Sequence, residues 1–407
     1  MPLSDPNPAR QALVIGAGLA GAAVCVALAR RGWRATLVDA APGPAQAASA
    51  LPVGMLSPHV TRAPTPLSRL SALGVADMRE QLEQLVPPGA GWQPCEVDNL
   101  GHDPGRWPAA LVRPASLVQA WLSQAQHLGR LQTIWNAPVA QLRPLGLGAG
   151  ADGWQALAAD GRVLAEAPAV VVAAAFGSQM LLAGCAQLDT DTLPLRPVQG
   201  QMSLAALAGE PLAPRPQRDN GVFVPVYEDA GLPPQWPSRL WAMGSTYERG
   251  LNSCTLSDAA HLRNAQSLQA MLPVAAQRLH EALAQGQLQG WAQVRCASLD
   301  RLPLMGAVPD VAALQGVMAA AGARRGRVPL SAVPRWTGLY TLSALGSRGL
   351  TLSHWCATQL AALMDGQAPD VPAQDADLIA ALDPARFAWR QARRQPQPVA
   401  HSTVTPA

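Results

Sequence analysis

The chain has 407 residues, of which 49% are hydrophobic and 14% are charged, and its formal net charge is +3. This length allows two domains with large cores, and so small a charge neither requires nor excludes a nucleic-acid partner. The six cysteines form no Cys-x-x-Cys pair, so neither a metal site nor a disulfide framework is predicted. All thirty basic residues are arginine, which excludes a Schiff-base or general-base lysine and leaves anion binding to guanidinium groups.

The strongest pattern lies near the start of the sequence. Residues 12–15 are apolar and predict a buried strand, which is followed directly by Gly16-x-Gly18-x-x-Gly21 and a helix. Gly16 permits a tight turn, Gly18 lets a pyrophosphate approach the backbone, and Gly21 lets the helix pack closely on the strand. The N–H groups at the start of this helix, around Ala20, are then available to phosphates.

A second strand is expected over residues 35–38, and it ends at Asp39. A carboxylate there, about 20 residues after the glycines, is placed to accept hydrogen bonds from ribose hydroxyls. Because residues 11–29 carry no charge, a membrane or signal segment is the alternative. Three glycines interrupt this segment and it has no basic start, so we expect a dinucleotide-binding domain, no membrane partner and a cytoplasmic location.

The stretch that follows mixes helices and strands. The loop around Gly54 is either a surface loop or a segment beside a flavin ring, and its composition favours neither. Residues 96–113 predict irregular structure, and a buried strand is expected to end at Gly177. The other expected elements are helices over 68–85 and 117–128, strands over 133–135 and 139–142, and a hairpin near 154–161.

From about residue 193 the pattern changes to short alternating strands with prolines and one helix over residues 258–285, which predicts an antiparallel sheet. A late strand over 338–343 then turns, at residues 346–351, into a helix that ends near residue 364. A chain that leaves a dinucleotide-binding domain and returns at its end is typical of flavin enzymes, and the late helix can direct its N-terminal dipole at the flavin. We therefore favour FAD over NAD.

The predicted fold class is α/β, with a Rossmann-like FAD-binding domain interleaved with an antiparallel-sheet (α+β) substrate-binding domain. The FAD-binding domain is expected to be discontinuous, and a disordered tail is expected at the end of the sequence. The expected boundaries are 11–75, 113–192 and 320–390 for the FAD-binding domain, 76–112 and 193–319 for the substrate-binding domain, and 395–407 for the tail.

Three segments together resemble the FAD-dependent amine oxidase family that includes glycine oxidase and D-amino-acid oxidase. They are the glycine turn with Asp39, residues 291–306 and residues 346–350. Within this family, four motifs are similar to the C-terminal oxidoreductase domain of the bifunctional enzymes that build 5-methylaminomethyl-2-thiouridine at the tRNA wobble position. The motifs are Val294-Arg-Cys-Ala-x-x-Asp-Arg-Leu-Pro-Leu304, Gly244-Ser-Thr-Tyr-Glu-Arg249, Gly200-Gln201 and Leu345-Gly-Ser-Arg-Gly-Leu-Thr351.

The resemblance implies FAD as the cofactor and tRNA as the substrate. The implied reaction oxidatively removes the carboxymethyl group from 5-carboxymethylaminomethyl uridine, leaving aminomethyl uridine and glyoxylate. The methyltransferase domain of those enzymes has no counterpart in this sequence, so a separate methyltransferase is an expected partner. Two alternatives remain, namely an oxidase of small free amino acids such as glycine or N-methylglycine, and a flavin-binding protein without turnover.

The resemblance also implies roles for individual residues. Arg295 is expected to bind the substrate carboxylate, the alternative being a structural ion pair with Asp300. Arg348 is expected to stabilise reduced flavin or to contact the same carboxylate, and Tyr247 and Arg249 are candidates to line the site. The expected FAD contacts are Gly16, Gly18, Ala20, Gly21, Asp39, Gly54, Gly177, Gly346, Ser347, Gly349 and Leu350.

Two groups of arginines are candidates for RNA contact, because guanidinium groups bind phosphates. The alternative for both groups is a solvated surface. Three scattered histidines, His59, His261 and His354, have no partners in the sequence pattern and are expected to be structural. The first arginine group is Arg324, Arg325 and Arg327 in a loop, and the second is Arg386, Arg390, Arg393 and Arg394 on a C-terminal helix.

Overall fold

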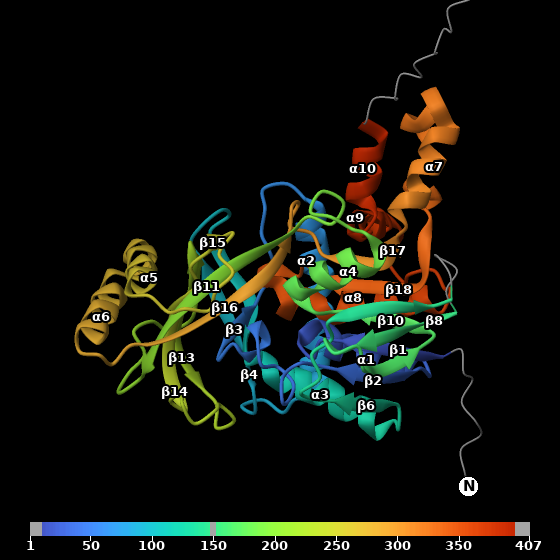
Figure 1. Cartoon of the computed structure of the whole chain (residues 1–407). Coiled ribbons are helices and arrows are strands. Elements are labelled where there is room, and N and C mark those ends of the chain that lie inside the picture. Colours follow the sequence, from blue (N-terminus) through green and yellow to red (C-terminus); the bar gives the residue numbers. More distant parts are fainter. Residues whose placement is uncertain (1–9, 147–151, 395–407) are drawn as a thin grey trace, which may run out of the picture.

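The computed structural model describes residues 10–146 and 152–394. Two sheets lie side by side, each covered by its own helices (Figure 1). The first sheet has six strands, all parallel except for one antiparallel edge strand. Its order is β17 (Leu304–Pro309), β18 (Arg335–Ser343), β10 (Ala169–Val172), β1 (Gln11–Ile15), β2 (Arg34–Val38) and β6 (Leu131–Ile134).

The first sheet is buried on both faces, which explains why β1 and β10 are continuously apolar. One face packs against helices α1 (Leu19–Arg30), α2 (Pro66–Leu85), α3 (Pro114–His127) and α8 (Gly349–Met364). Every residue of α1 except Arg30 is buried, so the uncharged segment is a core helix. The other face packs against α4 (Ser178–Ala186) and a three-stranded sheet of β7 (Gln141–Leu145), β8 (Gly153–Leu157) and β9 (Val163–Ala167).

The second sheet has nine strands and is largely antiparallel. Helices α5 (Asp258–Met271) and α6 (Pro273–Ala284) cover its outer part (Figure 1). The strand order is β15 (Glu248–Arg249), β11 (Leu195–Ala206), β14 (Arg239–Gly244), β13 (Gly221–Glu228), β12 (Gln217–Asp219), β4 (Trp92–Asn99), β5 (Gly105–Val112) and β3 (Gly54–Leu56), and β16 (Gln289–Ser298) pairs with β11.

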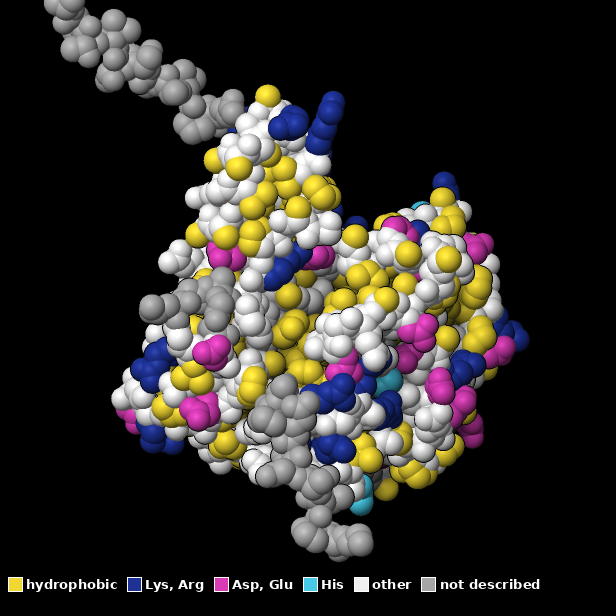
Figure 2. Space-filling view, turned by 90° about the vertical axis from the view of Figure 1, so that its right-hand side faces the viewer, with side chains coloured by type: hydrophobic (Ala, Val, Ile, Leu, Met, Phe, Trp, Pro, Cys, Tyr) yellow, Lys and Arg dark blue, Asp and Glu magenta, His cyan; other side chains and the backbone are white. Residues whose placement is uncertain are grey.

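A small projection stands beyond the edge of the first sheet. It consists of α7 (Val311–Ala321), the 3-10 turns η4 (Gly322–Arg327) and η5 (Leu330–Ala332), and α10 (Arg386–Arg394), and α9 (Asp377–Leu382) lies at its base. In Figure 2 the projection rises above the rest of that face, with hydrophobic side chains along it and arginines at its tip.

The two predicted layers, one α/β and one antiparallel, are confirmed, but several expected details differ. Residues 96–113 form most of the β4–β5 hairpin and are not irregular; Pro94 and Pro108 lie within its strands and obscure the strand pattern. The expected helix over 258–285 is two helices, because Pro273 starts the second one.

The strand pairing also shifts two expected domain boundaries. β3 pairs with β5 in the second sheet, although it was expected in the FAD-binding domain. β17 pairs with β18 in the first sheet, although residues up to 319 were expected in the substrate-binding domain. Both strands are short, and the sheet that each one joins depends on a partner strand that is distant in the sequence. The expected tail, 395–407, lies outside the described residues.

Candidate active site

A cavity of about 400 Å³ lies between the two sheets. At one end it is bordered by the backbone of Gly18, Leu19 and Ala20 together with Ser49, and we call this the main-chain end. At the other it is bordered by Ser245, Tyr247 and Arg295, the arginine end. The predicted site residues that line the cavity are Gly18, Ala20, Gly54, Arg295, Gly346, Ser347, Gly349 and Leu350, whereas Gly16, Gly21, Asp39, Gly177 and Arg348 lie outside its lining.

The glycine turn is built as the spacing requires. Gly16 has φ +104°, and a Cβ there would lie 2.6 Å from the carbonyl oxygen of Ala173. A Cβ on Gly21 would lie 1.8 Å from the carbonyl oxygen of Gly16, so a side chain at this position would separate α1 from β1. Gly16 and Gly21 therefore shape the turn without bordering the cavity.

Asp39 is held beside this turn by two backbone groups. The N–H of Ala17 donates to its Oδ2 at 2.6 Å, and the N–H of Ala41 donates to its Oδ1 at 2.8 Å. The carboxylate therefore lies against the first turn after β1, where a ribose bound along α1 would meet it.

Ser49 is a candidate that the sequence did not reveal. Its Oγ accepts a hydrogen bond of 3.0 Å from the N–H of Leu19, at the start of α1. A Cβ on Gly18 would lie 3.0 Å from the same oxygen. The hydroxyl thus occupies the position at which a phosphate would meet the N-terminus of α1. Ser49 lies in a run of small residues with no recognisable spacing, so no pattern singled it out.

The turn before α8 lines the wall of the cavity between its two ends. Gly346 has φ +57°, and a Cβ on Gly349 would lie 3.1 Å from Leu19, so the N-termini of α8 and α1 are neighbours. A Cβ on Gly54 would lie 2.6 Å from Leu350, which places the loop before β3 against the cavity and not on the outer surface. Two helix N-termini and a glycine-lined wall fit a dinucleotide that carries a pyrophosphate and a flat ring.

Arg295 projects from β16 into the arginine end. Its Nη1 donates to Ser245 Oγ at 2.9 Å and its Nη2 to the carbonyl of Thr246 at 2.7 Å, while its buried Nε has no hydrogen-bond partner among the described residues. Gly200 makes room for it, since a Cβ there would lie 2.0 Å from Nη2. Burial lowers the pKa of Arg295, so this fixed charge stands in a poorly solvated place.

The alternative role for Arg295, an ion pair with Asp300, is wrong. Asp300 is bound by Arg386, whose Nη2 and Nε lie 2.7 and 2.9 Å from its two carboxylate oxygens. Arg390 adds a third contact at 3.4 Å. Arg386 is 1% exposed, so it is a buried structural residue and not part of a solvated basic surface.

Tyr247 and Cys296 border the arginine end as well. The ring of Tyr247 lies 5.3 Å from the Arg295 guanidinium and 5.8 Å from that of Arg249, although Arg249 itself does not line the cavity. Burial raises the pKa of the Cys296 thiol to about 11, so it stays protonated at neutral pH. Hence the charge facing the cavity at this end comes from the arginine.

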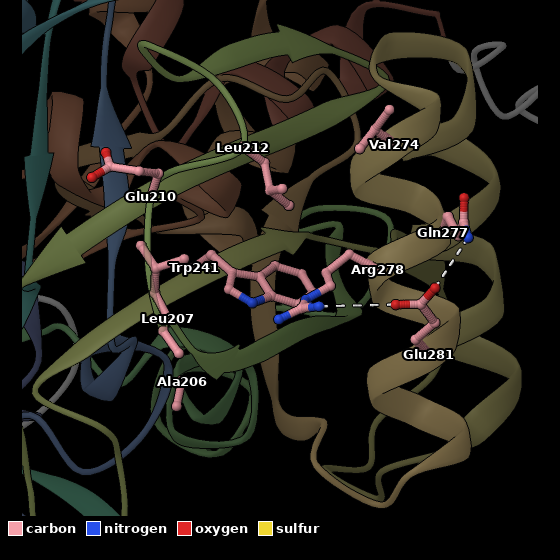
Figure 3. Close-up of a pocket in the computed structure, with 10 residues that line it drawn as sticks. Ala206, Leu207, Glu210, Leu212, Trp241, Val274, Gln277, Arg278 and Glu281 are labelled. Carbon is pink, nitrogen blue, oxygen red and sulfur yellow. Dashed lines mark hydrogen bonds and ion pairs between the residues drawn. The ribbon is translucent and has the colours of Figure 1, made fainter.

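A second hollow of about 360 Å³ lies where α6 meets the outer part of the second sheet (Figure 3). Trp241 and Val274 line it, and its Arg278 faces Glu281 at 3.9 Å. None of the predicted site residues borders this hollow. The cavity between the sheets is therefore the candidate active site.

The family described as FAD dependent oxidoreductase matches residues 11–111 and 106–363. The chain belongs to this family. FAD is its cofactor, and the main-chain end and the turn before α8 are the parts of the cavity that fit it. In this FAD-dependent oxidoreductase, the N-termini of α1 and α8, which are far apart in the sequence, border the same cavity.

Two relatives are similar in sequence to most of this FAD-dependent oxidoreductase. The chain is 37% identical to a tRNA 5-methylaminomethyl-2-thiouridine biosynthesis bifunctional protein MnmC from Paracidovorax citrulli, covering 87% of the chain and 57% of the relative. The protein of the same name from Verminephrobacter eiseniae is 35% identical, covering 90% and 62%. The chain thus spans about three fifths of the length of these relatives.

The solved structures include glycine oxidase from Geobacillus kaustophilus, with a TM-score of 0.65 and 17% identity, covering 93% of this chain and 99% of that one. Iminodiacetate oxidase from Chelativorans sp. BNC1 has a TM-score of 0.62 and 19% identity, covering 89% and 97%. At these identities the likeness establishes the fold alone. Among the described residues, no helix is both long and apolar enough to cross a membrane.

Proposed function

We propose that this FAD-dependent oxidoreductase removes the carboxymethyl group from 5-carboxymethylaminomethyl uridine or its 2-thio form at the tRNA wobble position. The products are the 5-aminomethyl uridine and glyoxylate. The observation that carries the proposal is Arg295, a partly buried guanidinium that borders the cavity with no carboxylate bound to it in the described part of the chain. The names of the relatives support tRNA as the substrate.

Arg295 would bind the carboxylate of the carboxymethylamino group. Ser245 and the carbonyl of Thr246 hold its two Nη atoms, so the cation is already oriented before substrate arrives. Its partly buried position strengthens the attraction, because little water screens the charge. The carboxylate thereby fixes the neighbouring methylene in the middle of the cavity, between the arginine end and the glycine-lined wall.

When bound, FAD would supply a hydride acceptor for the oxidation of this methylene, and hydrolysis of the resulting C=N bond would give the primary amine and glyoxylate. The chain's residues contribute position and electrostatics. Arg348, the N-cap residue of α8, would add a second positive charge near the cavity. Tyr247 covers Arg295 and limits its access to water.

The projection offers a surface for the body of the tRNA. Arg324, Arg325 and Arg327 lie in η4, and a hollow of about 320 Å³ beside them is lined by Gly326, Arg390, Arg393 and Arg394. Phosphate contacts of this kind make binding weaken steeply with salt. A methyltransferase, on this protein or another, would consume the primary amine, and the cytoplasm, where tRNA is modified, is the proposed location.

The test is reduction of the flavin-loaded protein by substrate in the absence of oxygen. The reduction is monitored as a loss of the visible absorbance of the flavin. We expect tRNA carrying 5-carboxymethylaminomethyl uridine to bleach the flavin rapidly, and excess glycine or N-methylglycine to bleach it slowly or not at all. Rapid bleaching by the free amino acid alone would assign the protein to small amino acids instead.

Arg295→Gln in the same assay should lower the second-order rate of bleaching by about 10³-fold, because a desolvated carboxylate loses its cation. Its flavin content should equal that of the wild type, since Arg295 lies away from the main-chain end. Arg278→Ala removes a charge at the remote hollow and serves as the matched control. An Arg295→Gln protein with an unchanged rate would contradict the assigned role.

A further inference from the structure

Three separate segments bring basic side chains together near the cavity. They are the loop after β3 with His59, the turn after β16 with Arg301, and the turn before α8 with Arg348. An isolated bridge between Ala297 and Leu345 brings the second and third segments side by side. With Arg218, these residues form what we call the cationic rim, namely His59, Arg218, Arg301 and Arg348.

Arg218 ties the first segment to the second sheet. Its Nη1 donates to Ser57 Oγ at 2.6 Å and to the carbonyl of Pro58 at 2.8 Å. Its Nε donates to Asn99 at 3.1 Å. None of these partners carries a negative charge, so Arg218 fixes the loop that carries His59 and keeps its own charge uncompensated.

The members of the rim repel one another. The pKa of His59 is lowered by burial and then by the positive charges of Arg348, Arg218 and Arg301. The pKa of Arg348 is lowered by burial and then by Arg301, although Tyr247 acts in the opposite direction. Placing like charges together in a poorly solvated position costs free energy, and a bound anion would offset that cost.

The nearest acid in the chain cannot supply this anion. Asp300 adjoins Arg301 in sequence, but its two oxygens are bound by Arg386 and Arg390. Across residues 10–146 and 152–394, neither Arg301 nor Arg348 makes an ion pair. The anion must therefore come from a ligand.

The FAD pyrophosphate and the substrate carboxylate already have other binding groups in the cavity. The pyrophosphate of FAD belongs at the N-terminus of α1, at the main-chain end. The substrate carboxylate belongs at Arg295, whose guanidinium lies 5.3 Å from the ring of Tyr247. We propose that the cationic rim binds a backbone phosphate of the RNA next to the modified uridine. This inference rests on the proposed function and adds a recognition site for the polynucleotide at the entrance to the chemistry.

Arg301 is the residue through which the rim can be tested. It is exposed and has φ +64°, a conformation that asparagine tolerates better than most residues. Arg301→Asn therefore removes the charge while keeping the turn, and Arg301→Lys restores the charge. Arg278→Ala is the control for the loss of a distant arginine.

The experiment compares two substrates in flavin-loaded protein: the 5-carboxymethylaminomethyl uridine nucleoside, and an anticodon stem–loop RNA that carries it. We expect Arg301→Asn to lower the ratio of kcat/KM for the stem–loop over the nucleoside by about tenfold, mostly through KM. The slope of log(kcat/KM) against log salt for the stem–loop should become shallower by about one. Arg301→Lys should recover most of both effects, and Arg278→Ala should show neither.

If Arg301→Asn keeps the wild-type ratio of kcat/KM values and the wild-type salt slope, the rim is not a phosphate site. The proposed function would remain intact. Failure of the wild-type protein to oxidise both the nucleoside and the stem–loop is a different result, and it would overturn the proposed function and the rim together.

Discussion

The two ends of the cavity are built from different parts of the polypeptide. At the main-chain end, Gly18, Leu19 and Ala20 border the cavity at the start of α1, and the missing side chain of Gly18 leaves room there. At the arginine end, the guanidinium of Arg295 supplies the recognition, and other residues hold it in place. On the proposed function, the backbone of α1 would hold the pyrophosphate of the cofactor, whereas the arginine end would select a carboxylate. Substrate choice can therefore change without disturbing the cofactor.

The main-chain end should be the more fragile of the two. In Gly21→Ala, the new Cβ would lie 1.8 Å from the backbone oxygen of Gly16, and neither atom can move without separating α1 from β1. We expect the variant to lose its flavin completely, as measured by the visible spectrum of the purified protein. Gly43→Ala is the matched control, because no atom lies within 4 Å of its added Cβ. A yellow Gly21→Ala protein would contradict this account of the turn.

Gly200→Ala should affect the arginine end and leave the main-chain end unchanged. Its Cβ would meet the tip of Arg295 at 2.0 Å, and a flexible side chain can move away where a backbone cannot. We expect the flavin content and melting temperature to stay near the wild-type values, while kcat/KM for the tRNA substrate falls by about 100-fold, since a displacement of about 1 Å in a positioning group costs that much. An unchanged kcat/KM would show that the orientation of Arg295 does not determine the rate of substrate oxidation.

Asp300→Asn tests how the arginine end is supported. Burial would raise the pKa of Asp300, but hydrogen bonds from Arg386 and its positive charge outweigh this, so the pKa is lowered. The ionised carboxylate then stabilises the fold above its ordinary pKa of about 4, and this contribution is lost as the pH falls through the lower, folded-state value. At pH 7 the variant should lose about 2 kcal/mol of unfolding free energy.

Urea unfolding of wild type and Asp300→Asn at a series of pH values provides the measurement. The difference between the two proteins should shrink as the pH falls below about 4, where the unfolded wild-type chain begins to bind a proton at residue 300, and should be smallest below the lower folded-state pKa. A difference that is independent of pH would show that charge at residue 300 is not what holds the turn.

The contrast between the ends also explains what the sequence could predict. The glycine turn, Asp39 and the residues before α8 belong to local patterns. Residues that are close in such a pattern are also close in the fold, so the sequence reveals them. The β4–β5 hairpin was missed because prolines lie within its strands. The pairing of β17 and the burial of Arg386 depend on partners many residues away, as does the contact of Gly200 with Arg295. No short window of sequence contains that information.

The interleaving of the first sheet has a consequence for biosynthesis. β1 pairs with β10 and β10 with β18, and α1 is covered by α8, whose last residue is Met364. At 5–20 residues per second, roughly 20 to 60 s separate the synthesis of α1 from that of α8. Throughout this interval α1, which is apolar except for Arg30, lies beside an unfinished sheet. Loading of the cofactor is consequently a late event that follows the synthesis of nearly the whole chain.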